Sequence, residues 1–108
     1  MSQKLYGDTH LTDANLEFLS KLEAIIDERV RDSAADSYTA SLIAAGSQRV
    51  AQKVGEEGVE LALAAVTGDR AEILDEAADL VYHLLVLLRD HAITLAELAA
   101  TLEARHTG

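Results

Sequence analysis

The sequence contains no cysteine, no proline and no tryptophan, and only one phenylalanine and three tyrosines among its 108 residues. Without cysteine there is no disulfide framework, no thiolate metal site and no cysteine nucleophile. The scarcity of aromatic residues argues against a β-sheet, because strands draw heavily on aromatic and β-branched side chains. The apolar residues are mostly alanine, leucine and valine, and alanine and leucine head the ranking of helix formers. The composition therefore predicts an all-α protein.

Positive charge is also scarce, with nine lysines and arginines against 19 aspartates and glutamates, a net charge of −10. This balance argues against binding to nucleic acid or to an anionic membrane. A small polyanion could still bind if a cation stood between it and the protein. The first ten residues lack the apolar core of a signal peptide, and apolar runs such as 84–88 are far too short to span a bilayer. We expect a soluble, cytoplasmic protein.

The length and the 49% hydrophobic content predict a single domain with a real core. Residues 1–11 show no periodicity and are expected to form a loose arm before a helical domain over 12–108. Apolar spacing and capping residues predict a bundle of four to five helices. Their expected ranges are 13–31 after a cap at Thr12 or Asp13, 38–45 ended by Gly46, 47–67 capped by Ser47, 70–91 capped by Asp69, and 95–105 after a Thr94–Glu97 capping box.

The second half of the helix expected over 70–91 is apolar around nearly its whole circumference, at Val81 and at Leu84 to Leu88. A helix that is apolar all round is buried all round. One small chain has too few other helices to cover it. We therefore predict a homodimer or larger homo-oligomer with this helix near the interface.

Two pairs of acids are spaced to lie on one stripe of their helices: Glu57 with Glu60, and Glu76 with Asp79. The short connection 67–69 makes the two helices antiparallel neighbours, so the pairs can face each other. Two like charges about 4 Å apart cost on the order of 4 kcal/mol at an effective dielectric constant of about 20. Protonation or a bound cation would relieve this cost. Oxygen ligands select hard ions, so Mg²⁺ fits best, with Mn²⁺ as an alternative.

The acids, and several residues near them on the same two helices, also have interpretations that require no functional site. Acids at helical spacing are usually solvated surface, although two matched pairs at the edge of a core weaken that interpretation. Lys53 could be a salt-bridge partner of Glu57 or a phosphate ligand. His83 is more often a satisfied, partly buried side chain than a ligand. Gly55 and Gly58 each cost about 1 kcal/mol in a helix, which suggests close approach of a helix or ligand, or a packing role.

Two segments, KVGEEGVE from Lys53 to Glu60 and EAADLVYH from Glu76 to His83, resemble the phosphoribosyl-ATP pyrophosphatases of histidine biosynthesis. The wider family of all-α nucleotide pyrophosphohydrolases carries EExxE followed by ExxD, here Glu56, Glu57 and Glu60, then Glu76 and Asp79. The fuller match adds SYTASL over 37–42 and DEAADLVYHLLVLL over 75–88. The resemblance covers about 37–105. It assigns no role to Ser37, Tyr38 or Thr39.

The resemblance implies hydrolysis of phosphoribosyl-ATP to phosphoribosyl-AMP and pyrophosphate. Glu57, Glu60, Glu76 and Asp79 would be Mg²⁺ ligands, and Glu56 a further ligand or the group that orients the attacking water. Lys53 would contact phosphate. The next enzyme, phosphoribosyl-AMP cyclohydrolase, is expected on a separate chain, because 108 residues are too few to include it.

Two other functions compete with this one. The first is a housekeeping hydrolase of non-canonical nucleoside triphosphates that uses the same metal site. The second is a non-catalytic helical interaction module whose acids only solvate its surface. Substrate profiling separates the two enzymes, and a Mg²⁺-dependent rise in melting temperature separates either enzyme from the module.

Overall fold

The computed structural model describes residues 13–32 and 37–107, which form five α-helices and no strand. The helices are α1 (Asp13–Asp32), α2 (Tyr38–Ala44), α3 (Ser47–Thr67), α4 (Arg70–Asp90) and α5 (Leu95–His106). The predicted all-α fold is therefore confirmed. The predicted arm over 1–11 and the cap at Thr12 lie outside the described residues.

The helix boundaries follow from local signals. The Asp69 carboxylate caps α4 by accepting hydrogen bonds from the backbone N–H groups of Ala71 and Glu72. Thr94 and Glu97 form the expected capping box at the start of α5. Gly68 ends α3 in the left-handed conformation, with φ of 80°, which costs glycine nothing.

The predicted cap at Ser47 is wrong. The N-cap of α3 is Gly46, whose φ of 106° suits glycine, and no side chain caps this end. Ser47 is instead the first helical residue. Its hydroxyl donates a hydrogen bond of 2.8 Å to Asp90 Oδ2, at the end of α4. The serine therefore joins the two long helices instead of capping one of them.

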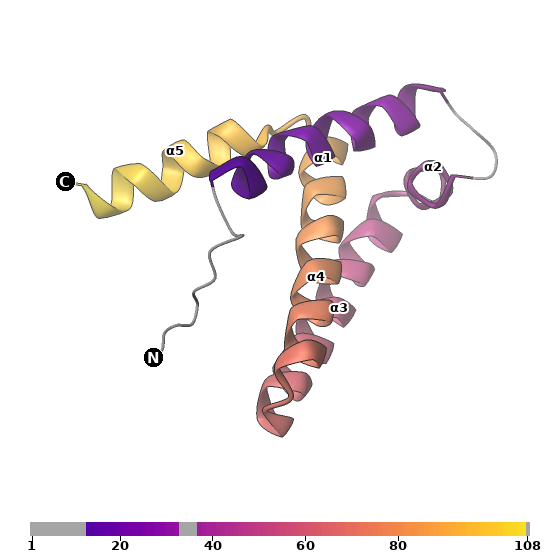
Figure 1. The fold of residues 1–108 in the computed structure, drawn as a ribbon. Coiled ribbons are helices and arrows are strands. Elements are labelled where there is room, and N and C mark those ends of the chain that lie inside the picture. The colour runs from indigo at the N-terminus through magenta and orange to yellow at the C-terminus, as the bar shows by residue number, and fades with distance from the viewer. Residues whose placement is uncertain (1–12, 33–36, 108) are drawn as a thin grey trace.

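The two long helices, α3 and α4, form an antiparallel hairpin that is the most extensive helix pair of the fold (Figure 1). The short α2 lies beside the start of α3, and α1 crosses the same end of the hairpin. At the end of α4 the chain turns into α5, which extends away from the hairpin. No helix in the described ranges is long and apolar enough to cross a membrane.

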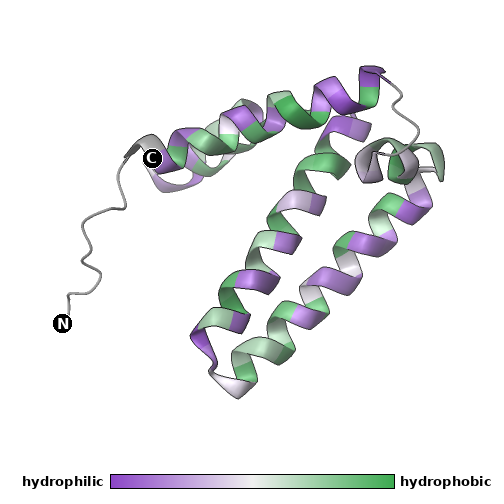
Figure 2. Cartoon of the chain, turned by 45° about the vertical axis from the view of Figure 1, so that its right-hand side comes forward, coloured by the Kyte–Doolittle hydropathy of each residue, from purple (hydrophilic) through white to green (hydrophobic). Residues whose placement is uncertain are grey.

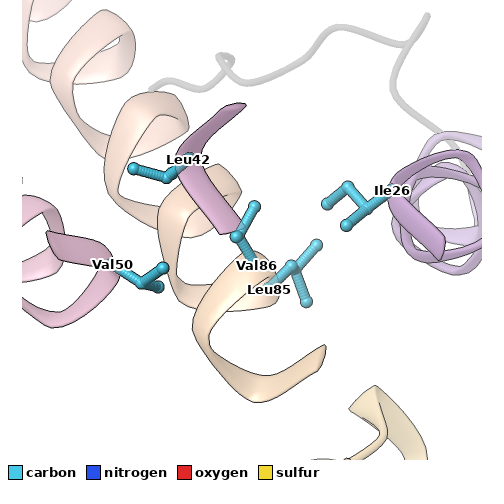
Figure 3. Close-up of a cluster of buried hydrophobic side chains, with 5 residues drawn as sticks. All are labelled: Ile26, Leu42, Val50, Leu85 and Val86. Atoms are coloured by element: carbon cyan, nitrogen blue, oxygen red, sulfur yellow. The ribbon is translucent and has the colours of Figure 1, made fainter. Parts of the chain in front are cut away.

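The hydrophobic core lies at the end of the hairpin where four helices meet (Figure 3). It consists of Ile26, Leu42, Val50, Leu85 and Val86, from α1, α2, α3 and α4. Burying each such side chain contributes roughly 1.5–3 kcal/mol. Apolar residues nevertheless continue along both arms of the hairpin toward its turn (Figure 2). There Val59, Leu63, Val66 and Leu74 are exposed, Val66 at 85%.

Candidate active site

The four acids predicted as metal ligands, Glu57, Glu60, Glu76 and Asp79, lie along the α3–α4 hairpin. Glu57 faces α4 and is only 5% exposed, which is unusual for a glutamate. Oxygens of Glu57, Glu76 and Asp79 all lie within 4.8 Å of one another. The antiparallel arrangement therefore brings one acid of α3 against two of α4, as the short 67–69 connection predicts.

Two oxygens of this acid cluster (Glu57, Glu76 and Asp79) are buried without a hydrogen-bond partner among the described residues, Glu57 Oε1 and Glu76 Oε1. Leaving a buried charged oxygen unsatisfied costs about 1–3 kcal/mol or more. A divalent cation would satisfy both oxygens and cancel the repulsion between the carboxylates. Because the donors are all carboxylate oxygens, the residues fit a hard ion such as Mg²⁺ or Mn²⁺.

The electrostatics of Glu76 reflect this crowding. Its pKa is raised, first by desolvation and then by the neighbouring Glu60, with further contributions from Asp79 and Glu57. Both causes disfavour the charged form of the carboxyl. Glu60 itself is exposed, and it lies beside Glu76 instead of in the acid cluster.

Glu60 and Glu76 also line a shallow pocket of about 310 Å³, whose other lining residues include Thr67 and Glu72 near the turn of the hairpin. Within this lining, the Thr67 hydroxyl donates a 3.1 Å hydrogen bond to Glu72 Oε1. Thr67 was not among the residues predicted from the sequence. Its position at a helix end gives no chemical signal by itself.

Lys53 and Glu56 occupy the side of α3 toward its start. The Lys53 ammonium lies 3.3 Å from Glu57 Oε2 and 3.7 Å from Glu56 Oε1. Burial, the largest single effect, lowers the pKa of Lys53. The hydrogen bond to Glu57 and the nearby negative charges together outweigh burial, so the pKa is raised. Glu56 points outward and accepts a 2.9 Å hydrogen bond from the Gln52 amide. Lys53 therefore makes the salt bridge with Glu57 that was one of its two expected roles.

His83 is buried, at 6% exposure, and both of its ring nitrogens have partners. Nδ1 lies 2.7 Å from the backbone carbonyl of Asp79, and Nε2 lies 2.8 Å from the Tyr38 hydroxyl. His83 is therefore a buried histidine with both ring nitrogens hydrogen-bonded, which is the alternative to a ligand role that the sequence favoured. Ser37, which had no predicted role, caps α2 by accepting a hydrogen bond from the backbone N–H of Ala40.

The raised pKa of Glu76 predicts a pH-dependent stability difference between the wild type and Glu76→Gln. The protonated glutamate and the glutamine are close mimics, so without metal the two proteins should be equally stable near pH 4. As the pH rises through the unfolded pKa of 4.5 toward the higher folded one, the wild type should lose stability relative to the variant. Urea unfolding of both proteins across this range measures the gap. A gap that stays constant with pH, or one that saturating Mg²⁺ leaves unchanged, would contradict the crowded acid cluster.

Together, the helical hairpin and the acid cluster define an all-α protein with a candidate hard-cation site between two helices. The family model described as phosphoribosyl-ATP pyrophosphohydrolase matches residues 19–106, which include every acid of the site. This chain belongs to the phosphoribosyl-ATP pyrophosphohydrolase family. The resemblance predicted from the sequence motifs is thereby confirmed, and the match extends into α1, where those motifs gave no signal.

Curated relatives support the same assignment. The chain is 56% identical over 89 residues to the histidine biosynthesis bifunctional protein HisIE of Shewanella oneidensis, covering 82% of this chain and 42% of that protein. It is 52% identical over 91 residues to the protein of the same name from Photobacterium profundum, covering 84% and 44%. The corresponding protein of Xylella fastidiosa is 53% identical over 90 residues, covering 83% and 44%. The chain thus spans less than half the length of these relatives.

Proposed function

We propose that this chain hydrolyses phosphoribosyl-ATP to phosphoribosyl-AMP and pyrophosphate in histidine biosynthesis, with a divalent cation held between α3 and α4. Water adds to phosphorus and one phosphoanhydride bond breaks, so pyrophosphate leaves. The observation that carries the proposal is the acid cluster, where Glu57, Glu76 and Asp79 meet inside the segment that matches the family model.

In this proposal Glu57, Glu76 and Asp79 hold Mg²⁺, with Mn²⁺ as an alternative, and Glu60 joins them from the next turn of α3. A bound ion of this kind neutralises phosphate charge and makes a bound water more acidic. It also explains how a chain with a net charge of −10 accepts a triphosphate. The two unpartnered oxygens of Glu57 and Glu76 support this assignment.

Glu56 and Lys53 act at the side of the cluster toward the start of α3. Glu56 orients the attacking water or accepts its proton, and its hydrogen bond from Gln52 holds the carboxylate in place. Lys53 contacts a phosphate of the substrate. On substrate binding, the Lys53 ammonium would exchange part of its pairing with Glu57 and Glu56 for the incoming anion, and Glu57 would be one of the residues that hold the cation.

A pyrophosphate-release assay tests the function directly. With Mg²⁺ present, purified protein should release pyrophosphate from phosphoribosyl-ATP, and removal of the ion with EDTA should stop the reaction. The same assay with a panel of canonical and non-canonical nucleoside triphosphates should show a preference for phosphoribosyl-ATP of at least about a hundredfold in kcat/KM. Turnover of the triphosphates but not of phosphoribosyl-ATP would favour the housekeeping hydrolase. No turnover of any substrate would favour the interaction module.

We also propose that the chain works as a homodimer or larger assembly. The described chain buries Leu85 and Val86 of α4 by itself, but it leaves Val81 exposed and Leu84, Leu87 and Leu88 only partly covered. The exposed apolar residues on α3 add to this surface. The surface of α3 is also open at Gly55 and Gly58, where an added Cβ atom would meet nothing within 4 Å. Neighbouring apolar surface of this kind is typical of subunit interfaces.

The cytoplasmic location and a phosphoribosyl-AMP cyclohydrolase on a separate chain stay predictions.

A further inference from the structure

The aromatic residues of the described chain that lie near the acids form one group. The Tyr38 ring stacks on the Tyr82 ring at a centroid distance of 6.4 Å and an interplanar angle of 28°. The His83 ring meets both of them edge-on, at 5.7 Å and 5.4 Å. Buried Thr39 contributes a hydrogen bond between its hydroxyl and that of Tyr82. We call Tyr38, Thr39, Tyr82 and His83 the aromatic group.

A chain of hydrogen bonds sets the orientation of the Tyr38 ring. The backbone carbonyl of Asp79 can only accept, so His83 Nδ1 carries a proton and donates to it. In the neutral imidazole, Nε2 is then an acceptor, and it receives the proton of the Tyr38 hydroxyl. The short helix α2 is thereby tied to the turn of α4 that carries Asp79.

Half of the Tyr38 side chain is nevertheless exposed, although its hydroxyl and part of its ring are engaged. An aromatic side chain that is fixed in place and half exposed presents a preorganised apolar surface. This surface lies close to the acid cluster, because the Tyr38 hydroxyl bonds to His83, whose other ring nitrogen bonds to the backbone carbonyl of Asp79, a member of that cluster. Lys53 lies one turn from Glu57 toward the start of α3, and α2, which carries Tyr38, packs against α3 and α4.

We propose that the exposed part of the Tyr38 ring is the surface on which the nucleobase of the substrate stacks, with Tyr82 and His83 holding the ring in position. The inference rests on the proposed function, because it places the phosphates at the acid cluster. The base then lies beside α2, which carries Tyr38.

The chemistry of the site favours a planar base over the other parts of a nucleotide. The phosphates need the cation and Lys53, and the surrounding acids repel any further anion. The base is the part of the molecule that aromatic stacking binds best, and stacking needs no positive charge from this acidic chain. A ring held by partners on one side loses little conformational entropy when a base covers its other side.

The test compares Tyr38→Leu with Tyr38→Phe in steady-state kinetics on phosphoribosyl-ATP. Tyr38→Leu removes the ring and should raise KM roughly tenfold, while kcat falls by no more than about threefold. Tyr38→Phe keeps the ring but loses the bond to His83, so KM should rise only about twofold. Phe18→Leu is the matched control, because Phe18 is also 50% exposed but lies on α1 and contributes nothing to the aromatic group. Its KM should equal that of the wild type.

Product inhibition then separates a base-stacking role from a structural one. In Tyr38→Leu, inhibition by phosphoribosyl-AMP should weaken about tenfold, whereas inhibition by pyrophosphate, which carries no base, should match the wild type. Equal weakening by both products, a lower kcat at unchanged KM, or a changed sedimentation coefficient would overturn the proposal. A failure of this inference can be told apart from a failure of the proposed function, because equilibrium dialysis of AMP against the wild type and Tyr38→Leu compares base binding even if phosphoribosyl-ATP is not hydrolysed. Equal AMP affinity of the two proteins would refute the stacking role.

Discussion

Replacing Asp79 with asparagine or Glu57 with glutamine is expected to lower the rate of phosphoribosyl-ATP hydrolysis by roughly a thousandfold or more, which corresponds to about 4 kcal/mol of transition-state stabilisation. Both residues belong to the acid cluster, whose oxygens lie within 4.8 Å of one another. Each substitution keeps the size of the side chain but removes a charged ligand. A cation held by the remaining carboxylates would bind more weakly and would be misplaced relative to the phosphates.

The two variants should differ in stability without metal. Asp79→Asn removes one of the charges that crowd Glu76, so its melting temperature should equal or exceed that of the wild type. Glu57→Gln also relieves crowding, but it takes away the carboxylate that pairs with Lys53 at 3.3 Å, so no gain is expected. Asp75→Asn is the matched control: it makes the same change of charge on the exposed side of α4, outside the acid cluster. Full activity in Asp79→Asn, or a comparable loss in Asp75→Asn, would remove these carboxylates from the mechanism.

The helices were predictable because their signals are local. Asp69 and the Thr94–Glu97 box each satisfy backbone groups within three residues, so the sequence carries the whole interaction. Ser47 shows the limit of this reasoning. A serine at the start of a helix is a good cap by propensity, but here its hydroxyl bonds to Asp90, 43 residues away. That tertiary contact is absent from any local pattern.

The acid cluster was predictable in outline for a similar reason. Spacing places Glu57 near Glu60 and Glu76 near Asp79, and a short turn makes the helices antiparallel. The rotation of α3 about its axis was not predictable, because it depends on how Val50 and Ala64 pack against α4. That rotation buries Glu57 and leaves Glu60 exposed, although both were predicted as equivalent ligands.

The aromatic group could not be predicted at all from spacing. The Tyr38–His83 hydrogen bond joins residues 45 positions apart, and it exists only because α2 packs beside the hairpin. The sequence does show that Tyr38 and Tyr82 are rare aromatic residues in this chain. Rarity identifies candidates for contact with a base but not their partners or their distance from the acids.

Mg²⁺ is expected to raise the melting temperature of the metal-free protein by several degrees. The acid cluster forms only in the folded chain, so an ion held there would bind the folded state alone and would stabilise it by mass action. At a concentration about ten times its dissociation constant, the gain is roughly 1.4 kcal/mol. In a domain of this size, each kcal/mol raises the melting temperature by about 4–8 °C. Thermal unfolding followed by circular dichroism, at fixed protein concentration and pH 7.5, measures the shift.

The Mg²⁺-induced rise in melting temperature should become smaller at lower pH, because of the raised pKa of Glu76. Its raised pKa means that protons compete with the ion for this carboxyl at mildly acidic pH, so the Mg²⁺-induced rise should shrink as the pH falls toward 4.5. NaCl at the same ionic strength controls for general screening, which also weakens repulsion between carboxylates. Asp79→Asn controls for ions bound elsewhere and should lose most of the response. If NaCl reproduces the full rise, or if Asp79→Asn keeps it, then the crowded carboxylates are relieved by screening alone and the cluster does not bind a specific cation.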